Sequence, residues 1–439
     1  MRSYTEVLDN SAWTRSHWNI FTIISLNYLL DGVMFSIAPL IAGLLAPEHY
    51  SLIFAANLLS ETVGAIVFGA LADRVGRRRM FLISLTIEGI SLILFLFTYR
   101  NILALAALTS AMTFGIGGEF GSSYSALAEL MPKRHRGKAI TLSTNFWNIG
   151  SAIIAGLALI FKSIYGDPET QLQYLLFSAV SMLIIAGLGR FSLPESPRWL
   201  AAKNRVREAE LVVSSITGFK ENFSVQTDVI EEHSFFITLP RYIFRLIILG
   251  VVTIVQYVTY SMMAYYAPYA PGFIFGVESA PLVIFIANLG ASIGGILLIP
   301  IIDKTRRWTT LLSFLGGTIG AFSLTALHYF SYLDLGGMAV VFFVTLFITL
   351  IFSEWAWASL STLQSELFPT GVRASVVGLL TGLTGISSAM IVLAQPSISA
   401  FLFLLTSSML WLMGFIAALA WYLKGVESAD KSVEELAHP

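Results

Sequence analysis

The stretch Glu129-Leu-Met-Pro132, with Arg136 four residues after the proline, decides the fold because it occurs twice. Its second copy is Glu366-Leu-Phe-Pro369, again with an arginine, Arg373, four residues after the proline. The two glutamates lie 237 positions apart in a chain of 439 residues, so each half carries one copy. This spacing indicates that one half of the chain duplicates the other.

A second, unrelated pattern repeats at nearly the same distance. An aspartate closes an apolar stretch and two consecutive arginines follow it, with 230 positions between the two aspartates: Asp73 with Arg77 and Arg78, then Asp303 with Arg306 and Arg307. Chance can supply one short match, but two patterns in register predict a duplicated half. Duplicated halves with a site between them are typical of membrane transporters.

The composition is that of a membrane protein. Hydrophobic residues make up 56% of the chain and charged residues only 12%, about half the share of an ordinary soluble domain. This excludes a cytosolic enzyme, a disordered scaffold and a disulfide-stapled secreted protein. The net charge of −1 gives no electrostatic case for nucleic-acid binding, and the absence of cysteine excludes disulfides and thiolate chemistry.

About twelve apolar stretches are long enough to cross roughly 30 Å of hydrocarbon as helices. They predict an all-α membrane protein with two pseudo-symmetric six-helix bundles, residues 1–193 and 243–439, joined by a cytoplasmic linker with short helices, 194–242. The stretches lie near 19–45, 51–72, 80–99, 102–131, 138–161, 173–193, 243–266, 280–301, 309–328, 338–363, 373–395 and 400–423.

The positions of lysine and arginine predict the orientation. With the N-terminus inside, only Arg100 and Lys162 of the 26 basic residues fall in outside loops. Such an asymmetry is typical of cytoplasmic loops. We therefore expect a multi-pass protein of the plasma membrane with both termini in the cytoplasm.

Four segments resemble a known family. Gly69-Ala-Leu-Ala-Asp-Arg-Val-Gly-Arg-Arg-Arg79 resembles the loop signature of the major facilitator superfamily, and Pro194-Glu-Ser-Pro-Arg-Trp-Leu200 resembles the element after span 6 in its sugar-porter-like branch. Tyr265-Tyr-Ala-Pro268 is similar to span 7 of sugar porters. Gly117-Gly-Glu119 is closer to metabolite–proton symporters. This resemblance implies alternating access of a central site between the two bundles.

The resemblance also implies a latch on the cytoplasmic side. Asp73 would lie at the N-terminal end of span 11, where a carboxylate is favoured by the helix dipole. Gly69 would permit close helix approach and Gly76 a turn, with ion pairs between Arg77 and Glu129 and between Arg306 or Arg307 and Glu366. The other expected latch residues are Arg74, Arg136, Glu195, Arg198, Asp303 and Arg373. The alternative is that these basic residues only anchor the spans.

Five acidic residues fall inside the spans: Asp31, Glu61, Glu88, Glu119 and Glu354. An ionised group in hydrocarbon is costly, so each is a candidate for function. No lysine or arginine lies near the middle of any span, so we expect unpaired carboxyl groups that favour their protonated form.

Asp31 and Glu119 are the predicted proton-coupling residues. Asp31 lies mid-span with Asn27 one turn earlier on the same face, and Asp31-Gly32 matches the acidic position of span 1 in proton-coupled relatives. A structural, hydrogen-bonded aspartate is the alternative. Glu88 is expected to be peripheral and is assigned no role.

Spans 4 and 10 line the central cavity in the resembled family, which would place Glu119 and Glu354 there. The expected substrate-binding residues are Asn27, Asn145, Gln256, Tyr265, Glu354 and Trp357. The sugar-binding pattern is eroded, because Val255, Thr144, Ser261 and Ser361 stand at polar or aromatic positions of sugar porters. The arginine that pairs with the span 1 acid in proton-coupled sugar porters is replaced by Thr109.

We therefore predict a secondary transporter, coupled to protons, that moves a small polar organic solute, sugar-like or another metabolite. The alternatives are an exporter of organic cations or drugs, a facilitative uniporter, and a membrane sensor with a transporter fold. No phosphate-cradling loop for ATP is encoded, and no catalytic or metal-ligand spacing indicates an enzyme or a cofactor. The expected partners are the solute, protons and the lipid bilayer, with a monomeric chain.

Overall fold

The computed structural model describes residues 3–219, 239–330, 335–369, 372–429, 431 and 433–436. Within these ranges the chain is helical, and no β-strand occurs among the described residues. Twelve helices are long and apolar enough to cross a membrane. The chain is therefore an all-α, multi-pass membrane protein, as the sequence predicts.

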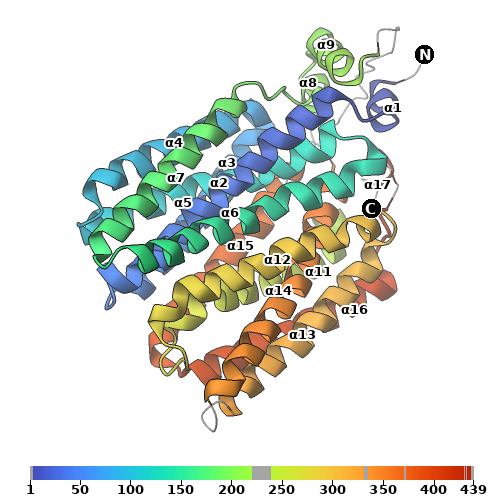
Figure 1. Ribbon diagram of the computed structural model, residues 1–439. Helices are drawn as coiled ribbons and strands as arrows, with labels where there is room; N and C mark the ends of the chain where they lie inside the picture. Colours follow the sequence, from blue (N-terminus) through green and yellow to red (C-terminus); the bar gives the residue numbers. More distant parts are fainter. Residues whose placement is uncertain are drawn as a thin grey trace.

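The helices form two bundles of six. The first, blue to green in Figure 1, comprises α2 (Arg15–Leu45), α3 (Tyr50–Val75), α4 (Arg77–Thr98), α5 (Ile102–Leu130), α6 (Arg136–Ile164) and α7 (Pro168–Arg190). The second, yellow to red, comprises α11 (Ile243–Ser261), α12 (Ala280–Ile302), α13 (Arg306–Phe330), α14 (Leu335–Glu366), α15 (Arg373–Ala394) and α16 (Ala400–Lys424). Each predicted span corresponds to one of these helices.

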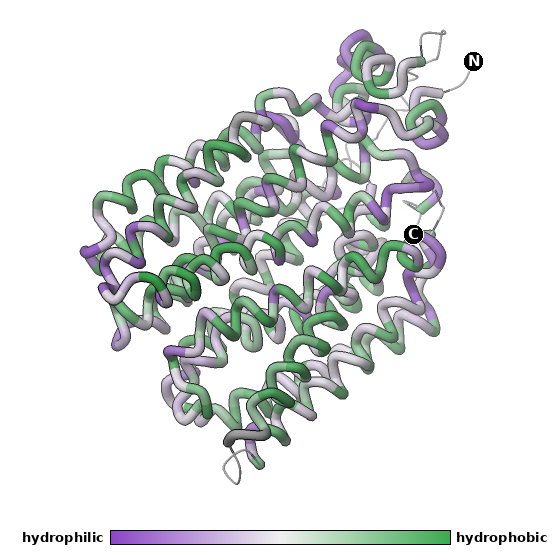
Figure 2. Tube along the Cα trace, viewed as in Figure 1, coloured by the Kyte–Doolittle hydropathy of each residue, from purple (hydrophilic) through white to green (hydrophobic). Residues whose placement is uncertain are grey.

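The outer surface is apolar along the spans. Large hydrophobic side chains are exposed on several helices, for example Phe97, Leu103, Val340 and Leu423. Figure 2 shows hydrophobic residues along both bundles and hydrophilic residues gathered near the two chain termini. This distribution suits lipid contact along the helices and water contact at their ends.

Both chain termini lie at one end of the molecule, called here the terminal end (Figure 1). Three short helices gather there: α1 (Tyr4–Asp9), α8 (Pro197–Ala202) and α9 (Val206–Thr217). α1 packs its apolar face against the other two. Of these, α8 and α9 are short helices within the segment 194–242, of which residues 220–238 lie outside the described part; α1 was not expected.

The two bundles meet where α3 packs against α15 and α6 against α12. Glycines permit the first contact: a Cβ on Gly69 would lie 2.8 Å from the carbonyl oxygen of Ala374. Within the first bundle, a Cβ on Gly117 would overlap the backbone carbonyl of Glu61. Close backbone approach at small residues is the usual basis of helix packing in membranes.

We expect Gly117→Ala to destabilise the first bundle by about 1–3 kcal/mol, the usual cost of overpacking, because backbone rather than a flexible side chain blocks the new methyl group. Gly187→Ala is the matched control, since its Cβ would lie 3.6 Å from Leu85 in ordinary contact. Thermal unfolding of the purified protein measures both. Equal melting temperatures for the two variants would contradict the proposed helix crossing.

Candidate functional site

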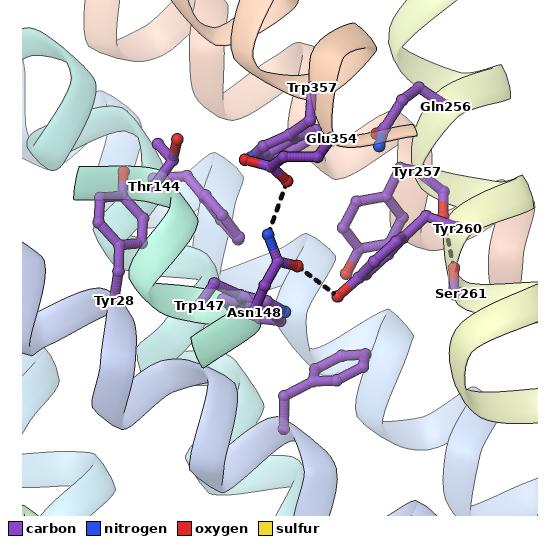
Figure 3. Close-up of a pocket in the computed structure, with 12 residues that line it drawn as sticks. Tyr28, Thr144, Trp147, Asn148, Gln256, Tyr257, Tyr260, Ser261, Glu354 and Trp357 are labelled. Atoms are coloured by element: carbon purple, nitrogen blue, oxygen red, sulfur yellow. Dashed lines mark hydrogen bonds between the residues drawn. The ribbon is translucent and has the colours of Figure 1, made fainter. Parts of the chain in front are cut away.

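A cavity lies between the two bundles near the middle of the molecule. The space between its walls that no atom fills is about 470 Å³, part of it open to solvent. Helices α2, α5 and α6 of the first bundle face α11 and α14 of the second across it. Its lining residues are Tyr28, Phe35, Phe120, Thr144, Trp147, Asn148, Gln256, Tyr257, Tyr260, Ser261, Glu354 and Trp357 (Figure 3).

A chain of polar contacts crosses the cavity from one bundle to the other. Asn148 of α6 donates its amide to Glu354 Oε2 of α14 at 2.7 Å, and its carbonyl oxygen accepts from the Tyr260 hydroxyl at 3.0 Å (Figure 3). Tyr260 also contacts Asn288 Oδ1 at 2.6 Å. The cavity is therefore held between the bundles by side chains from both.

Three of the six expected substrate-binding residues line this cavity: Gln256, Glu354 and Trp357. Tyr265 lies behind the wall, where its hydroxyl contacts Ser151 at 2.8 Å. Asn145 joins the bundles by donating to the Ser292 carbonyl at 2.9 Å. The sixth, Asn27, lies in a different site.

That second site is a cluster of three buried carboxyl groups inside the first bundle, Asp31, Glu88 and Glu119, called here the acid cluster. One oxygen from each lies within 4.8 Å of the others, and each residue is at most 1% exposed. Asn27 donates its amide to Glu119 and, at 3.3 Å, to Asp31. Glu119 thus lies beside Asp31 rather than among the cavity residues, and Glu88 is central to the cluster rather than peripheral.

The expectation that these acids lack a cation is wrong. Arg190, the last residue of α7, is 1% exposed and donates to Glu119 Oε1 at 2.5 Å. Its other amino group lies 3.7 Å from Glu88. Arg190 falls near the end of the predicted span 173–193, and its long side chain reaches back into the bundle.

Arg190 also supplies the positive charge that an arginine of span 4 supplies in proton-coupled sugar porters. Thr109 stands at that position and donates to Asn57 Oδ1 at 3.0 Å. Threonine carries no charge, so it cannot pair with the span 1 acid as an arginine would. Among the described residues, the guanidinium that pairs with the acid cluster comes from α7 instead. Sequence reasoning missed this because a residue at a helix end has no fixed partner until the helices are packed.

The remaining intramembrane acid, Glu61, connects the bundles. Both of its carboxyl oxygens accept the hydroxyl of Tyr257, at 2.6 and 2.7 Å. Tyr257 belongs to α11 and lines the cavity. Glu61 therefore lies directly behind the cavity wall.

At the terminal end, Asp73 caps the start of α15 as predicted. Its Oδ2 accepts the Ser375 backbone N–H at 2.9 Å and the Ser375 hydroxyl at 2.7 Å. The carboxylate therefore faces unpaired backbone N–H groups at the positive end of a helix from the other bundle.

Glu129 joins the two bundles at the same end. Its Oε1 lies 3.2 Å from Arg77 of its own bundle, the predicted pair, and 2.9 Å from Arg373 of the other. All three side chains are at most 2% exposed. Asp73 and Glu129 thus make buried, charge-assisted contacts between α3, α5 and α15, the residues expected to form the latch.

The second copy of the latch resolves an open choice. Arg306 pairs with Glu366 at 2.5 Å, whereas Arg307 donates to the Tyr422 carbonyl. Asp303 lies 3.6 Å from Arg306 and 3.9 Å from Lys138 of the first bundle. This copy is therefore present, and Asp303 lies against the first turn of α6 in the other bundle, where a Cβ on Gly137 would overlap its carboxylate.

A third duplicated element escaped the sequence analysis. Glu195 accepts the backbone N–H of Arg77 at 2.9 Å, and Glu427 accepts that of Arg306 at 3.1 Å. Ser196 and Ser428 follow these glutamates, 232 positions apart. The repeated Glu-Ser dipeptide at the interval of the other two patterns is the signal that would have identified it.

Several other expected latch residues surround this network. Gly76 has a φ of 106°, which favours glycine, and a Cβ there would overlap the Glu195 carboxylate. Arg198 and Arg136 both bind Asp9 of α1, at 2.8 and 2.7 Å.

Outside the spans, burial raises the pKa of the Glu195 carboxyl and of the Asp303 carboxyl. Arg74 is exposed and makes no ion pair with another described residue.

The opposite end of the molecule is also closed. The Tyr269 hydroxyl donates to the Pro39 carbonyl at 2.5 Å, and the Tyr269 carbonyl accepts from the Tyr50 hydroxyl at 3.0 Å. Tyr269 belongs to the second bundle, and Pro39 and Tyr50 to the first. Contacts between the bundles at both ends therefore enclose the cavity.

The cavity's aromatic wall was largely missed. Trp357 was expected there, but Tyr28, Phe35, Phe120, Trp147, Tyr257 and Tyr260 were not. The seven-residue interval from Tyr28 to Phe35 and the three-residue interval from Tyr257 to Tyr260 each place two rings on one helix face. This periodicity was available, but only packing shows which face meets the cavity.

Comparison with known proteins identifies the family. A family model described as Major Facilitator Superfamily matches residues 20–392, most of the chain. The protein belongs to this superfamily and is a secondary transporter of small solutes rather than an enzyme.

Its similarity to individual relatives is moderate. It is 26% identical to the inner membrane metabolite transport protein YgcS of Escherichia coli, covering 94% of this chain and 93% of YgcS. It is 26% identical to the minor myo-inositol transporter IolF of Bacillus subtilis, covering 78% and 74%. The proton:xylose symporter XylE of E. coli has the same fold, with a TM-score of 0.79 at 19% identity, covering 95% of this chain and 98% of XylE.

We expect Glu129→Gln to open the terminal end, because it removes one charge that binds both Arg77 and Arg373. Breaking a buried pair typically costs about 3–5 kcal/mol. The chain has no cysteine, so a single Ser261→Cys substitution reports access to the cavity. A water-soluble maleimide should label it at least about tenfold faster in the Glu129→Gln background.

The control for this experiment is Glu208→Gln, which breaks an exposed pair with Arg205 at the same end. Exposed pairs contribute little, so labelling should stay at the parent rate. An unchanged rate in the Glu129→Gln protein would show that this latch does not close the terminal end.

We also expect Glu427→Gln and Glu195→Gln to lower the melting temperature by similar amounts, because each carboxylate satisfies the backbone N–H groups that begin the next helix. A charge-assisted hydrogen bond contributes about 1.5–3 kcal/mol. Differential scanning fluorimetry measures the effect, with the exposed Glu208→Gln as control. A neutral result for Glu427→Gln alone would mean that the duplicated dipeptide has no structural role in the second bundle.

Proposed function

We propose that the protein is a proton-coupled transporter that moves a small polar organic solute by alternating access. The acid cluster is the observation that supports coupling most directly. Three carboxyl groups and one guanidinium share a site that is closed to water. With Arg190 charged, electroneutrality requires that two of the three carboxyl groups hold protons, because an unbalanced buried charge is costly.

Residues at the acid cluster are the direct chain neighbours of residues that line the cavity. Asn27 of the cluster precedes Tyr28 of the cavity on α2, and Glu119 precedes Phe120 on α5. A change in the protons held by the cluster alters the contacts of Asn27 and Glu119 and thereby the position of the cavity wall. Such a connection supplies the differential contacts that coupling requires.

The latch and the opposite closure support alternating access. Polar contacts between the bundles occur at both ends, through Glu129 and Arg373 at one and through Tyr269 and Pro39 at the other. Opening one set while the other holds exposes the cavity to one side at a time. We place the terminal end in the cytoplasm, from the distribution of basic residues, and propose that a monomer in the plasma membrane functions alone.

Proteoliposomes test this proposal. We expect an imposed pH gradient, acidic outside, to drive accumulation of a transported solute, with myo-inositol, D-xylose and phenethylammonium as the first candidates. Asp31→Asn should keep solute exchange at equal concentrations but reduce gradient-driven accumulation at least about tenfold, because one proton-holding carboxyl is lost. Glu169→Gln, which removes an exposed carboxylate, is the control.

Each other outcome has a meaning. Uptake that ignores the gradient in both proteins would identify a facilitative uniporter. Exchange of no solute would favour a membrane sensor with this fold. Either result would contradict proton-coupled transport.

A further inference from the structure

Two buried acceptor atoms in the cavity wall lack a partner among the described residues. They are Glu354 Oε1 and Gln256 Oε1, on residues that are 3% and 2% exposed. A buried acceptor without a donor costs about 1–3 kcal/mol. Both residues line the same cavity and project into it from the second bundle (Figure 3).

The second polar atom of each side chain makes a hydrogen bond that fixes the orientation of the group. Glu354 Oε2 accepts the Asn148 amide at 2.7 Å. The Ser353 carbonyl oxygen can only accept a hydrogen bond, so the Gln256 atom that lies 3.2 Å from it is the amide nitrogen. The Gln256 amide oxygen is therefore the atom without a partner. With the Glu354 carboxylate ionised, both free atoms are acceptors, and a ligand that satisfies them must carry donors.

Most donors of the cavity wall are already used within the protein, and the Tyr28 hydroxyl is an exception. The hydroxyl groups bind acceptors on neighbouring helices or in their own helix, and the Asn148 amide binds Glu354 and Asn145. The donors concerned belong to Thr144, Asn148, Gln256, Tyr257, Tyr260 and Ser261. A sugar, whose hydroxyl and ring oxygens need donors as well as acceptors, therefore finds few partners here.

The rest of the wall is aromatic. Seven of the twelve lining residues carry aromatic rings, and none is lysine, arginine or histidine. The Trp357 ring lies 6.0 Å from Phe120 of the other bundle and 6.0 Å from Tyr257. Aromatic faces attract cations, more strongly where water is excluded.

We propose that the cavity binds an organic cation, a protonated primary or secondary amine. Its N–H groups donate to Glu354 Oε1 and Gln256 Oε1, and its apolar body lies against Trp357 and the neighbouring rings. The ligand's charge neutralises the Glu354 carboxylate, which would otherwise be isolated in the membrane interior. This inference rests on the proposed transport function and names its substrate class.

Isothermal titration calorimetry on the purified full chain at pH 7 tests the inference. The probes are benzylammonium and phenethylammonium, each paired with the alcohol of the same shape, benzyl alcohol and 2-phenylethanol. Each pair differs in charge and not in the ring. We expect the ammonium to bind at least about tenfold tighter, as a charge-assisted hydrogen bond implies.

Glu354→Gln should abolish this preference because it removes the charge and keeps the size of the side chain. Trp357→Leu should weaken the ammonium more than the alcohol, as a cation–π contact implies. Glu278→Gln is the matched control, since its exposed carboxylate lies outside this cavity, and it should bind both probes as the parent does.

Three results would overturn the inference: equal affinity for alcohol and ammonium, no binding of either ammonium, or ammonium binding that Glu354→Gln leaves intact. The comparison within the unmodified protein stands even if a variant fails to fold. Accumulation of myo-inositol or D-xylose on a pH gradient without ammonium binding would refute the substrate class and leave proton-coupled transport standing. Ammonium binding without accumulation of any solute would refute proton-coupled transport and leave the substrate class standing.

Discussion

Inside twelve apolar helices, an isolated charge has no water to stabilise it, and this constraint explains where the polar side chains of the protein lie. A buried ion costs several kcal/mol unless it is paired or neutralised. Glu129 meets the constraint with Arg77 and Arg373, and in doing so it fastens one bundle to the other. Glu119 meets it with Arg190 inside a single bundle. The same requirement therefore produces ion pairs between the bundles at the terminal end and a buried acid–arginine cluster within the first bundle.

Duplication supplied the framework, and the two copies have since diverged. Asp73 and Asp303 occupy equivalent positions: Asp73 accepts from Ser375 at the start of α15, and Asp303 lies against Gly137 and Lys138 at the start of α6. The acid cluster occurs in the first bundle and the cavity carboxylate, Glu354, comes from the second. The acid cluster thus belongs to the first bundle alone, whereas residues of both bundles line the cavity. A movement between the bundles can therefore respond to both.

The acid cluster and the cavity are connected because α2 and α5 have two functional faces. Asn27 and Glu119 point into the first bundle, whereas their immediate neighbours Tyr28 and Phe120 line the cavity. Successive residues on an α-helix point about 100° apart, so one helix can present a proton-holding group to one side and a binding ring to the other. Because a helix is rigid, a shift of Asn27 or Glu119 on one face also moves the neighbouring ring on the other face.

The sequence by itself determined the number of spans, their grouping, the latch pairs and the presence of intramembrane acids. These features depend on the lengths of the apolar stretches and on repeated local patterns, both of which can be read directly from the sequence. Only the tertiary structure decided that Arg190 joins Glu119 and Glu88, that Asn27 faces the acid cluster, and that seven rings surround Glu354. The physical reason is that a helix in lipid is apolar on nearly all sides. Its hydrophobic pattern therefore does not reveal which face packs inward, and long side chains such as arginine find their partners only after the helices meet.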